Sequence, residues 1–175
     1  DGPVAVRYPR GSGPGVSLDD NALIPIEIGT AEKCRERIVD ESFAGNNKYL
    51  KVAILAFGSM VQPCMEVGDE LNTTVVNMRF IKPIDFNMLR TLADSHDVIV
   101  TVEEHVKMGG AGSACLEALS IIKLKKNNEI KFLHLGLPDR NIDHGDCETL
   151  LKREGLDFQG IKLSIEKFIK ELQQD

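Results

Sequence analysis

The chain has 175 residues, of which 42% are hydrophobic and 27% are charged, with 21 Lys and Arg against 27 Asp and Glu. This length and composition are those of one globular domain with its own core. The net charge of −6 argues against nucleic acid or an anionic membrane as the main partner, because phosphate groups bind basic surfaces. No run of about 18 apolar residues predicts a membrane span. The residues that follow Asp1 lack the basic region and the apolar core of a signal peptide, and we expect Asp1 to lie inside a longer protein.

Runs of apolar and β-branched residues predict strands, in chain order, at 3–8, 34–39, 51–57, 73–78, 97–102 and 130–135. Apolar residues at helical spacing predict helices at 61–71, 85–95, 113–123, 147–154 and 161–172. Strands that alternate with helices of 10–15 residues are typical of a parallel sheet covered on both faces. We therefore expect an α/β fold of three layers, α/β/α, with a mostly parallel, mixed sheet of about five strands.

The cysteines and histidines are widely scattered and do not predict a zinc site. The four cysteines are Cys34, Cys64, Cys115 and Cys147. Without a C-x-x-C pair or an export signal, they are expected to be reduced and buried.

A glycine-rich segment, Gly109–Ser113, follows a predicted strand and precedes a predicted helix. The free amides at a helix N-terminus favour an anion, so this segment could hold a phosphate. The dinucleotide pattern is incomplete, because Cys115 stands where its last glycine is required. The alternative, which we favour, is that the glycines allow the helix to pack close to a strand or another subunit.

Two polar clusters are weaker candidates for a site. Glu103, Glu104 and His105 lie at the end of a predicted strand, where α/β sheets bind ligands, but adjacent strand residues point to opposite faces. A structural role is therefore the better interpretation. A second group of carboxylates and a histidine surrounds a turn and could bind a divalent metal, although a solvated loop is favoured. Its members are Asp139, Asp143, His144 and Asp146.

Arg7 and Arg10 form the main basic element of this acidic chain, in the sequence Arg-Tyr-Pro-Arg-Gly that enters a Gly- and Pro-rich loop. A guanidinium group can hold phosphate oxygens through two parallel hydrogen bonds. By spacing alone, exposed structural arginines remain the simpler interpretation.

Six blocks of sequence together resemble the 1-deoxy-D-xylulose 5-phosphate synthase family, in the family's order and over nearly the whole chain. They are AVRYPRGSGPGV (5–16), VAILAFGSM (52–60), NMRFIKPID (77–85), TVEEHVKMGGAGSA (101–114), LGLPDRNIDHG (135–145) and EGLDFQGI (154–161). Transketolase and the pyruvate dehydrogenase β subunit share some of these themes. Within these blocks, RYPRG, GLPD…HG and GLD..GI resemble the synthase specifically.

The resemblance implies a thiamine-diphosphate transferase that joins pyruvate to D-glyceraldehyde 3-phosphate with loss of CO₂, for isoprenoid and thiamine precursors. It implies that residues 17–175 are the transketolase-like C-terminal domain and that 1–16 end the pyrimidine-binding domain. The catalytic residues, the thiamine diphosphate and the Mg²⁺ are then held upstream, with none in this chain, which is expected to be inactive alone.

The resemblance also implies that Arg10, and less strongly Arg7, holds the substrate phosphate. The expected partners are the upstream domains and a second subunit of a homodimer, and Glu103, Glu104 and Gly109–Ser113 become structural. The expected location is the cytoplasm for a bacterial parent and a plastid or apicoplast for a eukaryotic one. The alternative is a dimerisation or docking module of a related thiamine enzyme.

Overall fold

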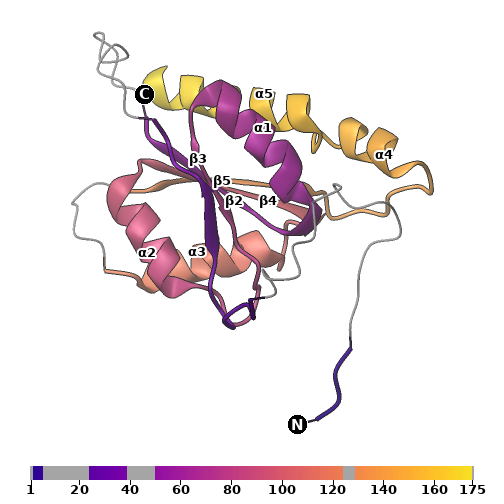
Figure 1. Ribbon diagram of the computed structural model, residues 1–175. Helices are drawn as coiled ribbons and strands as arrows, with labels where there is room; N and C mark the ends of the chain where they lie inside the picture. The colour runs from indigo at the N-terminus through magenta and orange to yellow at the C-terminus, as the bar shows by residue number, and fades with distance from the viewer. Residues whose placement is uncertain (1, 6–23, 39–49, 124–128, 175) are drawn as a thin grey trace.

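A computed structural model describes residues 2–5, 24–38, 50–123 and 129–174 of the chain (Figure 1). The strands are β1 (Glu32–Arg35), β2 (Val52–Ala56), β3 (Thr74–Asn77), β4 (Val98–Val106) and β5 (Lys131–Leu137). The helices are α1 (Val61–Leu71), α2 (Phe86–Ser95), α3 (Ala111–Ile121), α4 (Cys147–Arg153) and α5 (Phe158–Gln174), with a 3-10 turn at Gly58–Met60.

The strands form one mixed sheet in the order β1-β3-β2-β4-β5, in which only β1 is antiparallel to its neighbour. All five residues of β2 are buried, because helices cover the sheet on both faces. Long right-handed crossovers through helices are the usual way to join parallel strands. The expected three-layer α/β fold with a mostly parallel, mixed sheet is confirmed.

Two hydrophobic cores lie on opposite faces of the sheet. Side chains of β2 alternate between them, so that Val52 and Ile54 face the core under α1 and α5, whereas Ala53 and Leu55 face the core under α2 and α3. Figure 1 shows α1, α4 and α5 on one side of the sheet and α2 and α3 on the other. No helix of the described residues is long and apolar enough to cross a membrane.

Several predicted bounds differ from the structure, and the last helix, for example, begins at Phe158 rather than at 161. The strand expected at 34–39 lies at 32–35, and the strand expected at 97–102 extends to Val106. Within the expected strand at 3–8, residues 3–5 are not assigned to a strand, since they pair with none of the described strands.

The cysteines divide into two classes rather than being uniformly buried. Cys64 and Cys115 are buried, and their burial raises the pKa of each thiol to about 12. Cys34 is only partly buried and Cys147 is exposed, which corrects the expectation of four buried thiols. Cys147 is exposed because it opens α4, a short helix that buries none of its residues.

The order of the strands places a topological switch point between β2 and β4. The chain leaves β2 towards β3 on one side and returns to β4 on the other. Ligands of open α/β sheets bind outside the carboxyl ends of the strands at such a point. Ser59 and Glu104 lie at the carboxyl ends of β2 and β4, where this rule predicts a ligand.

Candidate functional site

Arg7 and Arg10, the two residues predicted to bind phosphate, lie outside the described residues, as does the expected domain boundary at 16/17. Their assignment stays a prediction. The other candidate groups lie on described elements, and their geometry can be examined directly.

Glu103 is a buried carboxylate that occupies the N-terminus of α3. It lies on β4 with only 3% of its surface exposed. One oxygen, Oε2, accepts a hydrogen bond from Ala111 N at 2.8 Å, and the other, Oε1, accepts one from Gly112 N, also at 2.8 Å. Nε2 of His134, on β5, lies 2.7 Å from the same Oε1. Glu103 therefore joins two strands to the helix that packs across them.

Two backbone amides of the glycine-rich segment bind the carboxylate of Glu103, and not an external phosphate. An ideal Cβ on Gly112 would lie 2.5 Å from Thr101 Oγ1 and closer still to His134 Nε2, so the helix approaches the sheet as only glycine allows. The amides of Ala111 and Gly112, which would bind an external anion, already bind Glu103. The prediction of close helix–strand packing is confirmed, and a phosphate on these two amides would have to displace a buried carboxylate.

Glu104 points away from this network, as the alternation of strand residues requires. It is exposed and accepts a hydrogen bond from Ser59 Oγ, which ties the carboxyl ends of β2 and β4 together at the switch point. Cys147 Sγ lies 3.8 Å from its other oxygen, and the charge of Glu104 adds to desolvation in raising the pKa of that thiol. Glu103 and Glu104 thus do not act as a pair on one substrate.

The acidic turn contributes a helix cap and not a cluster of ligands. Asp146 accepts hydrogen bonds from Thr149 N and Thr149 Oγ1, both at 2.9 Å, at the start of α4. These bonds lower the pKa of Asp146. Asp143 and His144 line a cavity of about 340 Å³ beside Glu104. Within the described residues, no three His, Cys, Asp or Glu side chains gather closely enough to hold a metal ion.

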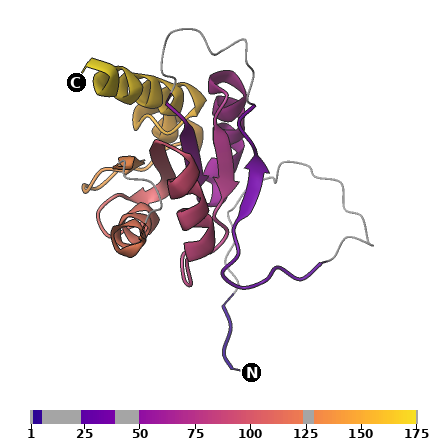
Figure 2. The ribbon, with the colours of Figure 1, turned by 90° about the vertical axis from the view of Figure 1, so that its left-hand side faces the viewer.

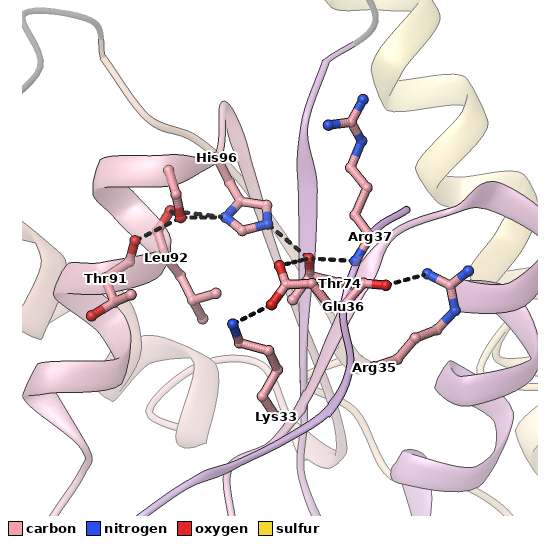
Figure 3. A network of polar contacts seen from close by, with 9 residues as sticks. Lys33, Arg35, Glu36, Arg37, Thr74, Thr91, Leu92 and His96 are labelled. Atoms are coloured by element: carbon pink, nitrogen blue, oxygen red, sulfur yellow. Dashed lines mark hydrogen bonds and ion pairs between the residues drawn. The ribbon is translucent and has the colours of Figure 1, made fainter. Parts of the chain in front are cut away.

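A third polar network, drawn in Figure 3, was not predicted. It lies at β1 and β3, on the edge of the sheet opposite to β5. His96, which is 6% exposed, follows α2 and places Nε2 2.9 Å from Thr74 Oγ1 on β3. The same hydroxyl accepts from Arg37 N at 3.2 Å and lies 3.5 Å from Glu36. No motif links residues so far apart in the chain, and a lone histidine after a helix gives no signal of its partners.

Comparisons with known proteins place this geometry in context. The family model described as "Transketolase, C-terminal domain" matches residues 47–161. A 1-deoxy-D-xylulose-5-phosphate synthase of Nitrosomonas europaea is 48% identical over 167 residues, and one of Chromobacterium violaceum is 46% identical over 166. The two matches cover 95% and 94% of this chain and 24% of each relative, so the chain spans about a quarter of their length.

Among solved structures, a split-gene transketolase described as an inactive β4 tetramer has a similar fold. The TM-score is 0.68 at 27% sequence identity, over 84% of this chain and 44% of that one. The match covers most of the chain, in agreement with a shared α/β fold.

Proposed function

Because the chain belongs to the transketolase C-terminal domain family, we propose that it is the C-terminal part of a 1-deoxy-D-xylulose-5-phosphate synthase. The whole enzyme would join pyruvate and D-glyceraldehyde 3-phosphate and release CO₂. The observation that carries this proposal is the 48% identity to a synthase of that name over 95% of the chain, together with the RYPRG block. We further propose that residues 1–16 end the preceding domain.

The proposed enzyme depends on thiamine diphosphate and Mg²⁺, and the described residues do not fit either group. They offer no cluster of three metal ligands, and Glu103 already binds the helix amides that a diphosphate would need. When bound, thiamine diphosphate supplies the carbanion chemistry of such enzymes. We therefore propose that both groups are held by the upstream part of the protein.

The contribution of this chain to the reaction is the binding of the aldehyde substrate through its phosphate. We assign that role first to Arg10, because it matches the arginine of the PRG sequence that holds the substrate phosphate in the family it resembles, and second to Arg7. A guanidinium group can hold phosphate oxygens through two donors. Pyruvate carries no phosphate, so its binding should depend much less on an arginine that holds a phosphate. The two substrates can therefore be separated kinetically.

The test replaces Arg10 by Ala in the full-length enzyme and measures the KM of each substrate. Loss of hydrogen bonds to a charged group costs about 1.5–3 kcal/mol, so the KM for glyceraldehyde 3-phosphate should rise roughly 10- to 150-fold. The KM for pyruvate should change little. Arg153→Ala, at an exposed arginine on α4, is the matched control. An unchanged KM for the aldehyde in Arg10→Ala would exclude the assignment.

A second candidate function is assembly, in which the domain is a dimerisation or docking module of a related thiamine enzyme. The similar split-gene transketolase is described as an inactive tetramer, which supports a role of this fold in assembly. Size-exclusion chromatography of the 175-residue chain distinguishes the two, because a pure assembly module would form stable oligomers by itself. Independently of the assembly test, we propose that the protein works in the cytoplasm if its source is bacterial, and in a plastid or apicoplast if its source is eukaryotic.

A further inference from the structure

A cavity of about 430 Å³ lies at the amino ends of the parallel strands, away from the switch point. It is bounded by residues after β1, the start of β2, the C-terminal end of α1 and the last turns of α5. Figure 1 and Figure 2 mark this end of α5 with the letter C. The volume falls in the range of about 300–1,000 Å³ that is usual for small-molecule sites. Four of the side chains that line the cavity are apolar and only partly exposed or buried: Leu50, Val52, Leu71 and Ile169.

The walls of the cavity are fixed by hydrogen bonds between segments far apart in the chain. Asn72, which ends α1 with a φ of 50°, accepts from Ile38 N and donates to Ile38 O, both at 2.9 Å. Arg35 Nε lies 2.7 Å from Asp69 Oδ1, and Nη1 of the same arginine donates to Thr73 O. These bonds join the residues after β1 to the end of α1, so the cavity is preformed.

The charged side chains that line the cavity are two arginines and two acids, Arg35, Arg37, Asp69 and Glu70. Arg35 pairs with Asp69, and Glu70 pairs with Lys162 on α5. Among the described residues, the side chain of Arg37 makes no hydrogen bond or ion pair, and Figure 3 shows its guanidinium group extending away from the other residues drawn. The cavity therefore combines an apolar wall with one unpaired positive charge.

We propose that this cavity binds a small amphipathic monocarboxylate, whose apolar chain lies on the apolar wall and whose carboxylate pairs with Arg37. A guanidinium group can hold a carboxylate through two parallel hydrogen bonds. Ile38, at the rim of the cavity, is 64% exposed, and the bound chain would remove part of this side chain from water. The proposal goes beyond the proposed function and does not depend on which reaction the parent protein catalyses.

The charges of the cavity favour a ligand with a single negative charge. A carboxylate neutralises Arg37, because the other arginine is already paired. A phosphate monoester would bring a second negative charge close to Asp69 and Glu70, which line the same cavity, and like charges side by side weaken binding. An amine would place its positive charge beside Arg37. An aliphatic monocarboxylate is therefore the class of ligand that fits.

The test is isothermal titration calorimetry of the full-length protein with octanoate, octanol and octyl phosphate. We expect octanoate to bind at least tenfold more tightly than octanol, which lacks the charge, and than octyl phosphate, which carries a second one. Arg37→Gln should weaken octanoate binding at least tenfold. Arg90→Gln, at an exposed arginine of α2 on the opposite face of the sheet, is the matched control and should leave it unchanged. Equal binding by the two variants, or tighter binding of octyl phosphate, would overturn the proposal.

A second measurement locates the ligand in the unchanged protein, so it does not depend on the folding of a variant. An octanoate analogue with a diazirine in its chain is photo-cross-linked to the full-length protein, and peptide mass spectrometry identifies the labelled residues. We expect the label on residues 50–52, 69–73 and 169–173, and its loss in the presence of excess octanoate. Label confined to other parts of the protein would overturn the proposal. Neither measurement uses activity, so failure here is distinct from failure of the proposed reaction.

Discussion

Glutamate and histidine side chains belong to polar networks at two places on the sheet, and the buried member differs between them. At the carboxyl end of β4, Glu103 is 3% exposed and His134 lies nearer the surface. At the other edge, His96 is buried while the Glu36 side chain is 59% exposed (Figure 3). The same residue types thus form one internal network and one surface network.

The difference teaches that burial, and not residue type, decides what each glutamate does. Buried in the sheet, Glu103 has exchanged water for two helix amides and a histidine, so its loss leaves buried donors unpaired. Near the surface, Glu36 keeps much of its hydration and pairs with the side chain of Lys33. Exposed ion pairs contribute little to stability.

The largest expected effect is that of Glu103→Ala. Removal of one partner from a buried, charge-assisted network costs about 3–5 kcal/mol, which would take much of the stability of a typical domain. The free energy of unfolding, measured by urea denaturation, should fall by that amount. Glu104→Ala is the matched control, because the neighbouring carboxylate is exposed, and its effect should stay within about 0.5 kcal/mol. Equal effects of the two substitutions would remove the distinction between the networks.

A smaller loss of unfolding free energy is expected when a methyl group is added inside the same network and no hydrogen-bond partner is removed. In Gly112→Ala the new methyl group would lie against Thr101 Oγ1 and His134 Nε2. Overpacking of a filled interior costs about 1–3 kcal/mol. Gly145→Ala serves as the control, because its Cβ would make only ordinary contacts, the nearest at 3.4 Å from Leu150. A Gly112→Ala protein as stable as Gly145→Ala would contradict the close approach of α3.

Most of the fold could be predicted from the sequence, because its signals are local. The continuous apolar run of β2 is typical of a strand buried on both faces, and Asp85 is the helix cap that its position before α2 predicts. The predicted bounds of β1 were less accurate than those of β2. Its two central residues, Lys33 and Cys34, give no apolar alternation, and its pairing with β3 fixes its bounds.

The candidate site was less predictable, because its parts come together only in three dimensions. The glycine-rich segment was found, together with its two possible roles, but the anion at its helix N-terminus comes from β4 and is Glu103. No spacing in the sequence connects Glu103 with His134, which lies on the next strand of the sheet. Likewise, His96 and Thr74 meet only because α2 returns the chain to the edge of β3.

The smallest expected effect is that of Glu36→Gln, and it depends on pH. The hydrogen bond from Lys33 holds the pKa of Glu36 below its ordinary value of 4.5, while partial burial acts in the opposite direction. Because the folded state lowers this pKa, the ionised carboxylate stabilises the fold above pH 4.5, and the contribution is lost as the pH falls through the lowered pKa. Thermal unfolding near pH 7 should show a loss of about 0.2–1 kcal/mol, as for exposed pairs, and the two proteins should converge in acid. Glu117→Gln, on the exposed face of α3, controls for the change in net charge. A loss above 3 kcal/mol, or one that persists in acid, would place Glu36 in the same class as Glu103.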